Sequence, residues 1–536
     1  MPQNSTSTEY PQTTSRKMQA KKIDFTETNQ FSGIFLDYIS NSESLRDFYR
    51  SAPSSENIES FIQSKNYDDG QRNTLVKVLR EQYQGLSLSE NLGLNLDLLE
   101  KENTFTITTG HQLNIFSGPL YFMYKIVTAI NACKELKEKY PNYNFVPVYW
   151  MAGEDHDFEE INHFSLFGKK YQWNSDQKGP VGKFDPAGLQ EVLNELPEKI
   201  ELFEKAYCDF ESLCDATRYF VNELFGQEGL VVIDADHKDL KNLFTRVIKD
   251  DLQHHQANEI VERDSEKLAG QGYKTQVFPR KINFFYMEKG IRERIVREDD
   301  QYKVLNSDLS FSESEIIQLC EEEPEKFSPN VILRPLYQEM ILPNLAYIGG
   351  PGELAYWLQL KGVFEHYDVA YPMFLPRNHA ILINKGSQKK LDKLGMQATD
   401  LFETYDQLKE SFLKSQDSRE VDVSDQKTKI SEQFDQLKEL AGQIDQSLQG
   451  YIAAEEQKSL KAIDNIEKRL KKAEESKSET SLQQIRGLLE KHFPGGTPQE
   501  RSDNFLNFYI NNPSFIQDLL DNFSPFDLRY LILMDE

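Results

Sequence analysis

A chain of 536 residues is long enough for two or more domains with buried cores. Its 61 Lys and Arg residues against 87 Asp and Glu residues give a net charge of −26, which argues against a general nucleic-acid or anionic-membrane surface. It has no apolar run near the roughly 18 residues of a membrane span and no signal-peptide core in its Ser/Thr-rich first residues, so we expect a soluble cytoplasmic protein.

The spacing of apolar residues predicts helices first and then an alternation of strands and helices. Phe35 to Leu99 is helical and amphipathic, and strand-like runs then recur with segments of helix length between most of them. Such alternation favours an α/β fold with a largely parallel, doubly wound sheet. The predicted strands are Phe105–Thr108, Phe145–Tyr149, Leu230–Ile233, Val331–Leu333, Ala346–Ile348 and Ala370–Phe374.

Two further segments have patterns of their own. Lys281 to Val304 alternates around a Glu-Lys-Gly turn, which predicts a β-hairpin inserted into the α/β body. Apolar residues at four- and three-residue steps from Ile430 to Tyr451, resumed from Ile463 to Ala473, predict a coiled coil that either dimerises or packs on itself. We expect an N-terminal extension over residues 1–22, the core with its helical lead-in and insertions over 23–385, the coiled coil over 386–490, and a C-terminal segment over 491–536 that packs on the core.

An acidic cluster directly follows a predicted strand. Glu154, Asp155, His156 and Asp157 come after Trp150, and two more glutamates follow at once. In an extended segment the two aspartates share one side and the histidine points away. The cluster is suited to binding an ammonium group, to deprotonating an amine or to holding Mg²⁺, whereas a capping role would explain one carboxylate but hardly five.

A second strand-to-helix junction contains glycine, histidine and serine. Gly110-His111-Gln112 ends the first predicted strand, and Ser117-Gly118 precedes the helix predicted from Leu120 to Leu136. A glycine here lets the backbone approach a ligand, and His111 is able to donate to a phosphoryl or carboxylate oxygen, although a capping histidine at a tight turn explains it equally well. Lys125, on the helix that follows, either reaches toward an anion or snorkels, and we expect it to snorkel.

A third junction combines an arginine with paired glycines. Arg334 precedes the predicted strand that holds Tyr347, and Gly349-Gly350 leads into a helix near Glu353. Such a turn suits a bound carboxylate or phosphate, with the arginine as a clamp, but it has neither the P-loop lysine nor the full dinucleotide fingerprint. Arg377 follows another predicted strand and is either an anion contact or part of a structural salt bridge.

At these motifs the chain resembles the cysteine ligases of bacillithiol biosynthesis, the BshC family. The resemblance covers nearly the whole chain from about Met18, which we therefore expect to be the natural start. It is carried by Thr109–Gln112 with Phe116–Tyr121, by Val146–Trp150 leading into Gly153–Asp157, by Gly349–Glu353 and by Gln499-Glu500-Arg501.

The resemblance implies a Rossmann-like core related to class I aminoacyl-tRNA synthetases, two connecting-peptide insertions, and a C-terminal coiled coil that supports a homodimer. It also implies the reaction, which joins L-cysteine to glucosaminyl-malate in the last step of bacillithiol biosynthesis. Members of the family often carry Gly-Gln-Gln in place of Gly110-His111-Gln112, so His111 is expected to contact a ligand rather than to carry a proton. No Lys-Met-Ser-Lys-Ser loop is present, so ATP and Mg²⁺ follow only from the chemistry of amide formation.

The predicted site therefore has two groups of residues, and no metal ligand is assigned. A non-catalytic scaffold that senses a metabolite and binds partners through the coiled coil is the alternative function. The catalytic candidates are Asp155, Asp157, Glu154 and His156, and the substrate-binding candidates are Gly110, His111, Gln112, Ser117, Gly118, Trp150, Arg334, Tyr347, Gly349, Gly350, Glu353 and Arg377.

Overall fold

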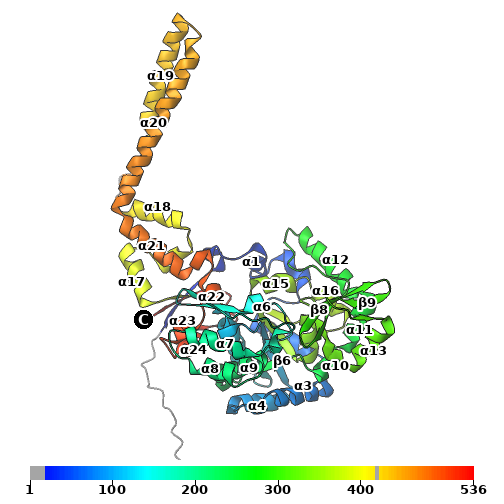
Figure 1. Cartoon of the computed structure of the whole chain (residues 1–536). Helices are drawn as coiled ribbons and strands as arrows, with labels where there is room; N and C mark the ends of the chain where they lie inside the picture. Colours follow the sequence, from blue (N-terminus) through cyan, green and yellow to red (C-terminus); the bar gives the residue numbers. More distant parts are fainter. Residues whose placement is uncertain (1–17, 417–421, 536) are drawn as a thin grey trace, which may run out of the picture. The chain divides into compact units, whose positions relative to one another are not determined.

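The computed structural model describes residues 18–416 and 422–535, which divide into two compact units (Figure 1). The first unit comprises Met1–Leu382 with Pro498–Glu536, and the second comprises Ile383–Thr497. None of the helices in the described ranges is long and apolar enough to cross a membrane.

A five-stranded parallel sheet forms the centre of the first unit. The strands are β2 (Thr104–His111), β3 (Asn144–Met151), β6 (Val231–Asp234), β12 (Asn344–Gly349) and β13 (Met373–Pro376), in the order β13-β12-β2-β3-β6. The chain proceeds from β2 to β3 and β6 on one side and places β12 and β13 on the other side. The strand order therefore reverses next to β2, and in open α/β sheets ligands bind at such a point beyond the carboxyl ends of the strands.

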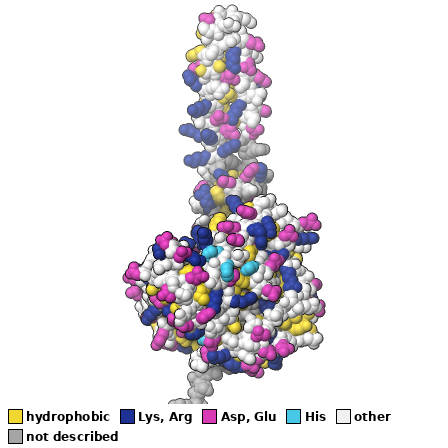
Figure 2. Space-filling view, turned by 90° about the vertical axis from the view of Figure 1, so that its right-hand side faces the viewer, with side chains coloured by type: hydrophobic (Ala, Val, Ile, Leu, Met, Phe, Trp, Pro, Cys, Tyr) yellow, Lys and Arg dark blue, Asp and Glu magenta, His cyan; other side chains and the backbone are white. Residues whose placement is uncertain are grey.

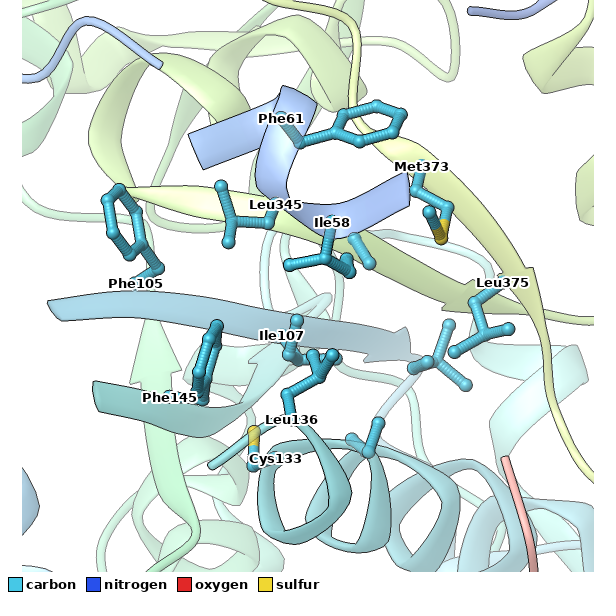
Figure 3. Packing of buried hydrophobic residues seen from close by; sticks show 14 of the residues in the cluster. Ile58, Phe61, Phe105, Ile107, Cys133, Leu136, Phe145, Leu345, Met373 and Leu375 are labelled. Atoms are coloured by element: carbon cyan, nitrogen blue, oxygen red, sulfur yellow. The ribbon is translucent and has the colours of Figure 1, made fainter. Parts of the chain in front are cut away.

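Helices cover both faces of this sheet. Figure 3 shows Ile58 and Phe61 of α2 (Ile58–Ser64) on one side of the strands and Cys133 and Leu136 of α5 (Tyr121–Lys139) on the other. The strand residues between them, such as Ile107, are fully buried. Because helices cover both faces of the sheet, β2 and β3 are buried almost throughout, including the threonines of β2. Cys133 is a packing residue of this core.

The remaining elements of the first unit are a helical lead-in, two insertions and the covering helices. The lead-in is α1 (Gly33–Ile39), α2, α3 (Asp69–Gln82) and α4 (Glu90–Leu98). Between β3 and β6 lie α6 (Phe158–Ile161), β4 (His163–Leu166), β5 (Lys169–Gln172), α7 (Leu189–Glu195), α8 (Glu201–Cys208) and α9 (Leu213–Phe225). After β6 follow α10 (Lys238–Asn242), α11 (Thr245–His254), α12 (Gln256–Gly270), α13 (Glu313–Glu322), α14 (Arg334–Ile341), α15 (Pro351–Trp357) and α16 (Lys361–His366).

The predicted inserted hairpin is part of a larger antiparallel sheet. Its strands are β7 (Phe284–Glu288), β8 (Ile291–Glu298), β9 (Gln301–Val304), β10 (Ser310–Phe311) and β11 (Phe327–Pro329), in the order β10-β9-β8-β7-β11. β7 and β8 pair directly, with Glu288 opposite Ile291, as the alternation predicts.

Two predicted strands need correction. Val331–Leu333 is the turn that leads into α14, where Pro335 occupies the first helical turn. Ile332 and Leu333 are fully buried, so the apolar run reflects burial rather than strand pairing, and proline with its fixed φ is well suited to a helix start. The strand predicted at Ala370–Phe374 begins three residues later, at Met373.

A small sheet joins the two ends of the first unit. β1 (Met18–Ile23) pairs antiparallel with β15 (Tyr530–Asp535), which also pairs with β14 (Ala380–Ile383). The prediction of an N-terminal extension over residues 1–22 is therefore wrong for residues 18–22, which form a paired strand. Local composition does not reveal this pairing, because the partner strand lies more than 500 residues away in sequence. The prediction for residues 1–17 lies outside the described residues. The C-terminal part of this unit also contains α22 (Gln499–Ser502), α23 (Leu506–Tyr509) and α24 (Phe515–Asn522).

The second unit is helical. It contains α17 (Lys385–Leu394), α18 (Tyr405–Ser415), α19 (Ser424–Ile444), α20 (Leu448–Lys477) and α21 (Glu479–His492). The long helices α19 and α20 pack on each other as an antiparallel hairpin, and Lys427 forms ion pairs with Asp464 and Glu467 at 2.7 and 2.9 Å. Side chains of both charge signs lie along it (Figure 2). Within one chain the two helices thus pack on each other, but the predicted seam is not buried between them, because Leu437, Ile444, Leu448, Tyr451, Ile466 and Leu470 remain exposed.

Candidate active site

A cavity of about 720 Å³ opens at the carboxyl ends of β2, β3, β12 and β13. It lies at the point where the strand order reverses, and its lining combines side chains from the sheet, from the loops after the strands and from the antiparallel insertion. Twelve of the sixteen predicted site residues line it, namely Gly110, His111, Gln112, Trp150, Glu154, Asp155, His156, Arg334, Tyr347, Gly350, Glu353 and Arg377.

One half of the cavity is acidic and is built by the loop after β3. Gln112 Nε2 donates to Asp155 Oδ2 at 2.9 Å and to Glu160 Oε2 at 2.6 Å. The backbone N–H of His156 donates to Asp155 Oδ1 at 2.7 Å. The side-chain amide of Gln112 thus holds two carboxylates at the same wall, so this wall presents concentrated negative charge to the cavity.

Asp155 stays ionised. Its burial opposes ionisation, but hydrogen bonds from His156 and Gln112 and the charge of Arg292 outweigh that effect and hold the pKa of the Asp155 carboxyl well below its usual range. Arg292 is 3.8 Å from Asp155, donates to His156 Nδ1 at 2.6 Å and stacks on Phe285. A carboxylate with so low a pKa is a weak proton acceptor at neutral pH, so Asp155 is suited to holding an ammonium or amine group rather than to deprotonating it.

The structure separates the other members of the acidic cluster. Glu154 pairs with the fully buried Lys241 at 2.8 Å, and Lys241 also donates to the carbonyl of Phe327. Glu154 therefore ties the loop after β3 to α10 and β11. Asp157 is exposed, lies at the start of α6 and is not part of the cavity lining.

The other half of the cavity is cationic and lies beyond β12 and β13. Arg334 rests over the rings of Trp150 and Tyr347, 5.9 and 5.6 Å from their centroids, and its Nη2 has no hydrogen-bond partner among the described residues. Arg377 is 2 % exposed and follows β13. Guanidinium groups with unsatisfied N–H donors at a cavity wall are suited to carboxylate or phosphate groups.

Lys125 links the end of β2 to α15 at the cavity wall. Its ammonium group donates to the Gly110 carbonyl at 2.8 Å and pairs with Glu353 at 2.6 Å. Glu353 also accepts from Tyr347 Oη at 2.6 Å and from the Gly350 N–H at 2.8 Å. The prediction that Lys125 snorkels is wrong, because its 3 % exposed side chain points inward to a buried carboxylate.

His111 is neutral in this environment. Burial and the charges of Lys125 and Arg377 hold the pKa of its imidazole well below the usual range. The ring stacks on Phe122 with centroids 4.9 Å apart, and Nε2 has no partner among the described residues. A neutral imidazole with one open nitrogen is suited to contacting a ligand, and this role of His111 stays a prediction.

Ser117, Gly118 and Gly349 shape the protein around the cavity without lining it. Ser117 and Gly118 have φ of 68° and 63°, and Asn504 Nδ2 donates to the Gly118 carbonyl at 2.6 Å. A β-carbon on Gly118 would lie 2.5 Å from that of Asn114, and one on Gly349 would lie 2.5 Å from the Phe374 ring. These glycines are therefore required by the turn and by strand packing.

Sequence reasoning did not assign Arg292, Arg501 or Glu160 to the site. Arg292 comes from the inserted sheet and Arg501 from α22, so no local motif links them to the strand ends. The Gln499-Glu500-Arg501 motif was the one available signal for Arg501. Among the described residues, no group of three or more His, Cys, Asp or Glu side chains is placed to hold a metal ion.

Fold and cavity define a Rossmann-like α/β protein with a small-molecule site at the reversal of its strand order and a C-terminal coiled coil. Residues 18–378 match the family model "Bacillithiol biosynthesis BshC, N-terminal Rossmann-like domain", and residues 380–534 match "Bacillithiol biosynthesis BshC, C-terminal coiled-coil domain". The chain belongs to the BshC family, a family of ligases.

Two similar proteins carry the name "Putative cysteine ligase BshC". The protein from Flavobacterium johnsoniae is 44% identical over 524 residues, covering 95% of this chain and 99% of its own. The protein from Christiangramia forsetii is 43% identical over 533 residues, covering 96% of this chain and 99% of its own.

Proposed function

We propose that the chain joins L-cysteine to glucosaminyl-malate through an amide bond, in the last step of bacillithiol biosynthesis in the cytoplasm. Membership in the family gives the pathway, and the relatives' name gives cysteine as the substrate. The observation that carries the proposal is the division of one cavity into an acidic wall beyond β3 and a cationic wall beyond β12 and β13.

This division matches the chemistry of the proposed acceptor. Glucosaminyl-malate has an amine at one end and two carboxylates at the other. An amine is attracted to the wall of Asp155 and Glu160, and malyl carboxylates are attracted to Arg334 and Arg377. The two walls therefore favour a single orientation, with the amine next to Asp155.

In the reaction, the amine nitrogen attacks the carboxyl carbon of cysteine after that carboxyl has been activated. The new bond is an amide, the activating group leaves with the carboxyl oxygen, and the proton of the nitrogen passes to solvent water. Asp155 orients the amine, because its low pKa makes it a fixed anion. Activation needs an energy source, for which a nucleotide such as ATP with Mg²⁺, or another activated donor, is the chemical requirement.

We further propose that the protein is a homodimer formed through the helical hairpin of the second unit. Support comes from the apolar side chains that remain exposed on α19 and α20, of which Ile444 is 73 % and Tyr451 is 65 % exposed. Light scattering of the wild type and of an Ile444→Ser variant tests this point, since a dimer that depends on this surface will dissociate in the variant.

The test of the reaction is direct. The purified protein is incubated with L-cysteine and glucosaminyl-malate, with and without ATP and Mg²⁺, and bacillithiol, AMP and ADP are followed by mass spectrometry. Product with stoichiometric AMP supports a ligase that acts through an adenylate, and ADP supports an acyl phosphate. If both substrates bind and no product forms under any condition, the proposed reaction is wrong for this chain alone.

A further inference from the structure

The short helix α22 brings two charged side chains to the cationic wall from a part of the chain far from the strands. Glu500 lies buried behind Arg377, while Arg501 is exposed and lines the cavity. More than 120 residues separate this helix from Arg377, and the whole second unit lies between them in sequence.

Glu500 fixes the guanidinium group of Arg377. Arg377 Nη1 donates to Glu500 Oε2 at 2.9 Å and Nη2 donates to Oε1 at 2.6 Å. His379 Nδ1 lies 2.9 Å from Oε1, and none of the three side chains is more than 5% exposed. A two-point contact of this kind sets the plane of the guanidinium and occupies both of its terminal nitrogens.

Nε is the one nitrogen of Arg377 that takes no part in these contacts, since Nη1 also donates to the carbonyl of Asn378 at 3.0 Å. It has no hydrogen-bond partner among the described residues, although it is buried. A β-carbon built on Gly350 would lie 3.7 Å from it, which places Nε beside the glycine turn that lines the cavity. The pair with Glu500 therefore leaves Arg377 with a donor in a fixed position next to the ligand space.

Arg501 supplies a second cation beside it. The guanidinium carbons of Arg501 and Arg377 lie 5.7 and 5.1 Å from the centroid of the Tyr121 ring. In the described part of the chain no carboxylate pairs with Arg501. An unpaired arginine on a cavity wall, next to a second open guanidinium donor, is the arrangement expected for an anion-binding subsite.

We propose that Arg501 and Arg377 Nε together bind one anionic group of a substrate, and that Glu500 is the positioning residue that holds Arg377 for this contact. The inference rests on the proposed function and deepens it, because that function places a malyl carboxylate or a phosphate group at the cationic wall. A carboxylate and a phosphate both present charged oxygens to the arginines, so the subsite could bind either group. The experiment below distinguishes between them.

The test uses calorimetric titration of the full-length protein with L-malate and, separately, with inorganic pyrophosphate. Arg501→Gln and Glu500→Asp are compared with the wild type and with Arg469→Gln, a matched change at an exposed arginine of α20. Arg501→Gln is expected to lower the affinity for one of the two anions about tenfold or more, which is the effect of losing a charged hydrogen bond. The anion whose affinity falls identifies the group that the subsite binds.

Glu500→Asp keeps the charge but withdraws the carboxylate from Arg377 by one methylene group, so it is expected to lower the affinity for the same anion. In turnover assays this variant should raise KM for the substrate that carries this anion and change kcat by less than about twofold, whereas a general structural defect would lower kcat as well. Arg469→Gln should match the wild type.

Unchanged affinity for both anions in Arg501→Gln, or in correctly folded Glu500→Asp, would overturn the proposal, as would a wild type that binds neither anion. Binding is measured without turnover, so the two proposals fail separately. If the variants lose anion affinity but the wild type forms no amide, the subsite is supported and the proposed reaction is rejected. If the wild type forms the amide but the variants keep their anion affinities, the reaction is supported and the subsite is rejected.

Discussion

The two walls of the cavity are built in opposite ways. The acidic wall comes from one continuous loop after β3, and its key carboxylates have partners within the protein, Gln112 for Asp155 and Lys241 for Glu154. The cationic wall is assembled from three distant segments, around Arg334, Arg377 and Arg501, and within residues 18–416 and 422–535 it keeps guanidinium donors without partners.

This difference indicates separate tasks for the two walls. Carboxylates that are already hydrogen-bonded are held in place and keep their charge, as required for orienting a reacting amine. Open guanidinium donors are costly to bury unless a ligand satisfies them, as required for binding. The acidic wall is therefore expected to affect turnover, and the cationic wall is expected to affect affinity and stability.

The largest effect is expected from removing the central cation. Arg377→Gln leaves the buried carboxylate of Glu500 without its two-point partner, and breaking a buried ion pair costs on the order of 3–5 kcal/mol. Urea unfolding measures this loss, with Arg469→Gln as the control that should lie within about 0.5 kcal/mol of the wild type. A loss below about 1 kcal/mol would show that the pair does not support the cationic wall.

The next effect is a pH dependence of stability that originates at the same wall. Burial and the charge of Arg377 lower the pKa of His379 to about 4, against about 6.5 in the unfolded chain. Below pH 6.5 the unfolded chain therefore binds a proton that the folded protein does not bind. The free energy of unfolding falls by on the order of 3 kcal/mol as the pH falls from about 6.5 to 4.

Unfolding free energies at pH 7, 5.5 and 4 measure this slope, and His379→Gln should make it shallower than in the wild type. Glu500 does not cause the difference between these two slopes, because its carboxylate is present in both the wild type and the His379→Gln variant. Its own pKa is held well below the usual range, since the effects of Arg377 and His379 exceed the opposing effect of burial. Identical slopes in the two proteins would show that folding does not lower the pKa of His379.

For the acidic wall the expected effect is on turnover. Asp155→Asn keeps the size of the side chain and removes the charge that attracts and orients the amine, so kcat should fall about 100-fold, the size typical of losing one group that acts at the reacting atoms. The midpoint temperature of thermal unfolding should change little by comparison. A variant with full kcat would remove Asp155 from the mechanism.

The sequence predicted Asp155 on the acidic wall and Arg334 and Arg377 on the cationic wall, and all three line the cavity. Asp155 belongs to a local cluster after an apolar strand, and both features are visible within a dozen residues. The parallel sheet could be predicted in the same way, because its strands are short apolar runs between helices. The family match supports the Rossmann-like domain and the coiled coil that the resemblance implied.

What the sequence did not reveal depends on contacts between distant segments. Lys125 resembles a snorkelling lysine until β12 and α15 bring Glu353 within 2.6 Å of it. The apolar residues before Arg334 resemble a strand because Ile332 and Leu333 are fully buried in that turn, although Val331 is 42% exposed. The apolar periodicity from Ile430 onward does not show where the chain reverses, and in the structure a short connection folds α19 and α20 into a hairpin whose exposed apolar residues are the proposed dimer surface.

The smallest expected effect sharpens the contrast within the acidic cluster itself. Asp157 is two residues from Asp155 and was predicted to share its role, yet it is exposed and outside the cavity lining. Asp157→Asn should therefore change kcat and KM by less than about twofold, because an exposed charge in water acts only weakly on groups beyond its own neighbourhood. Measured beside Asp155→Asn under the same conditions, it is a matched control of equal charge and size. A loss as large as that of Asp155→Asn would mean that the loop after β3 rearranges when substrate binds and turns Asp157 toward the amine.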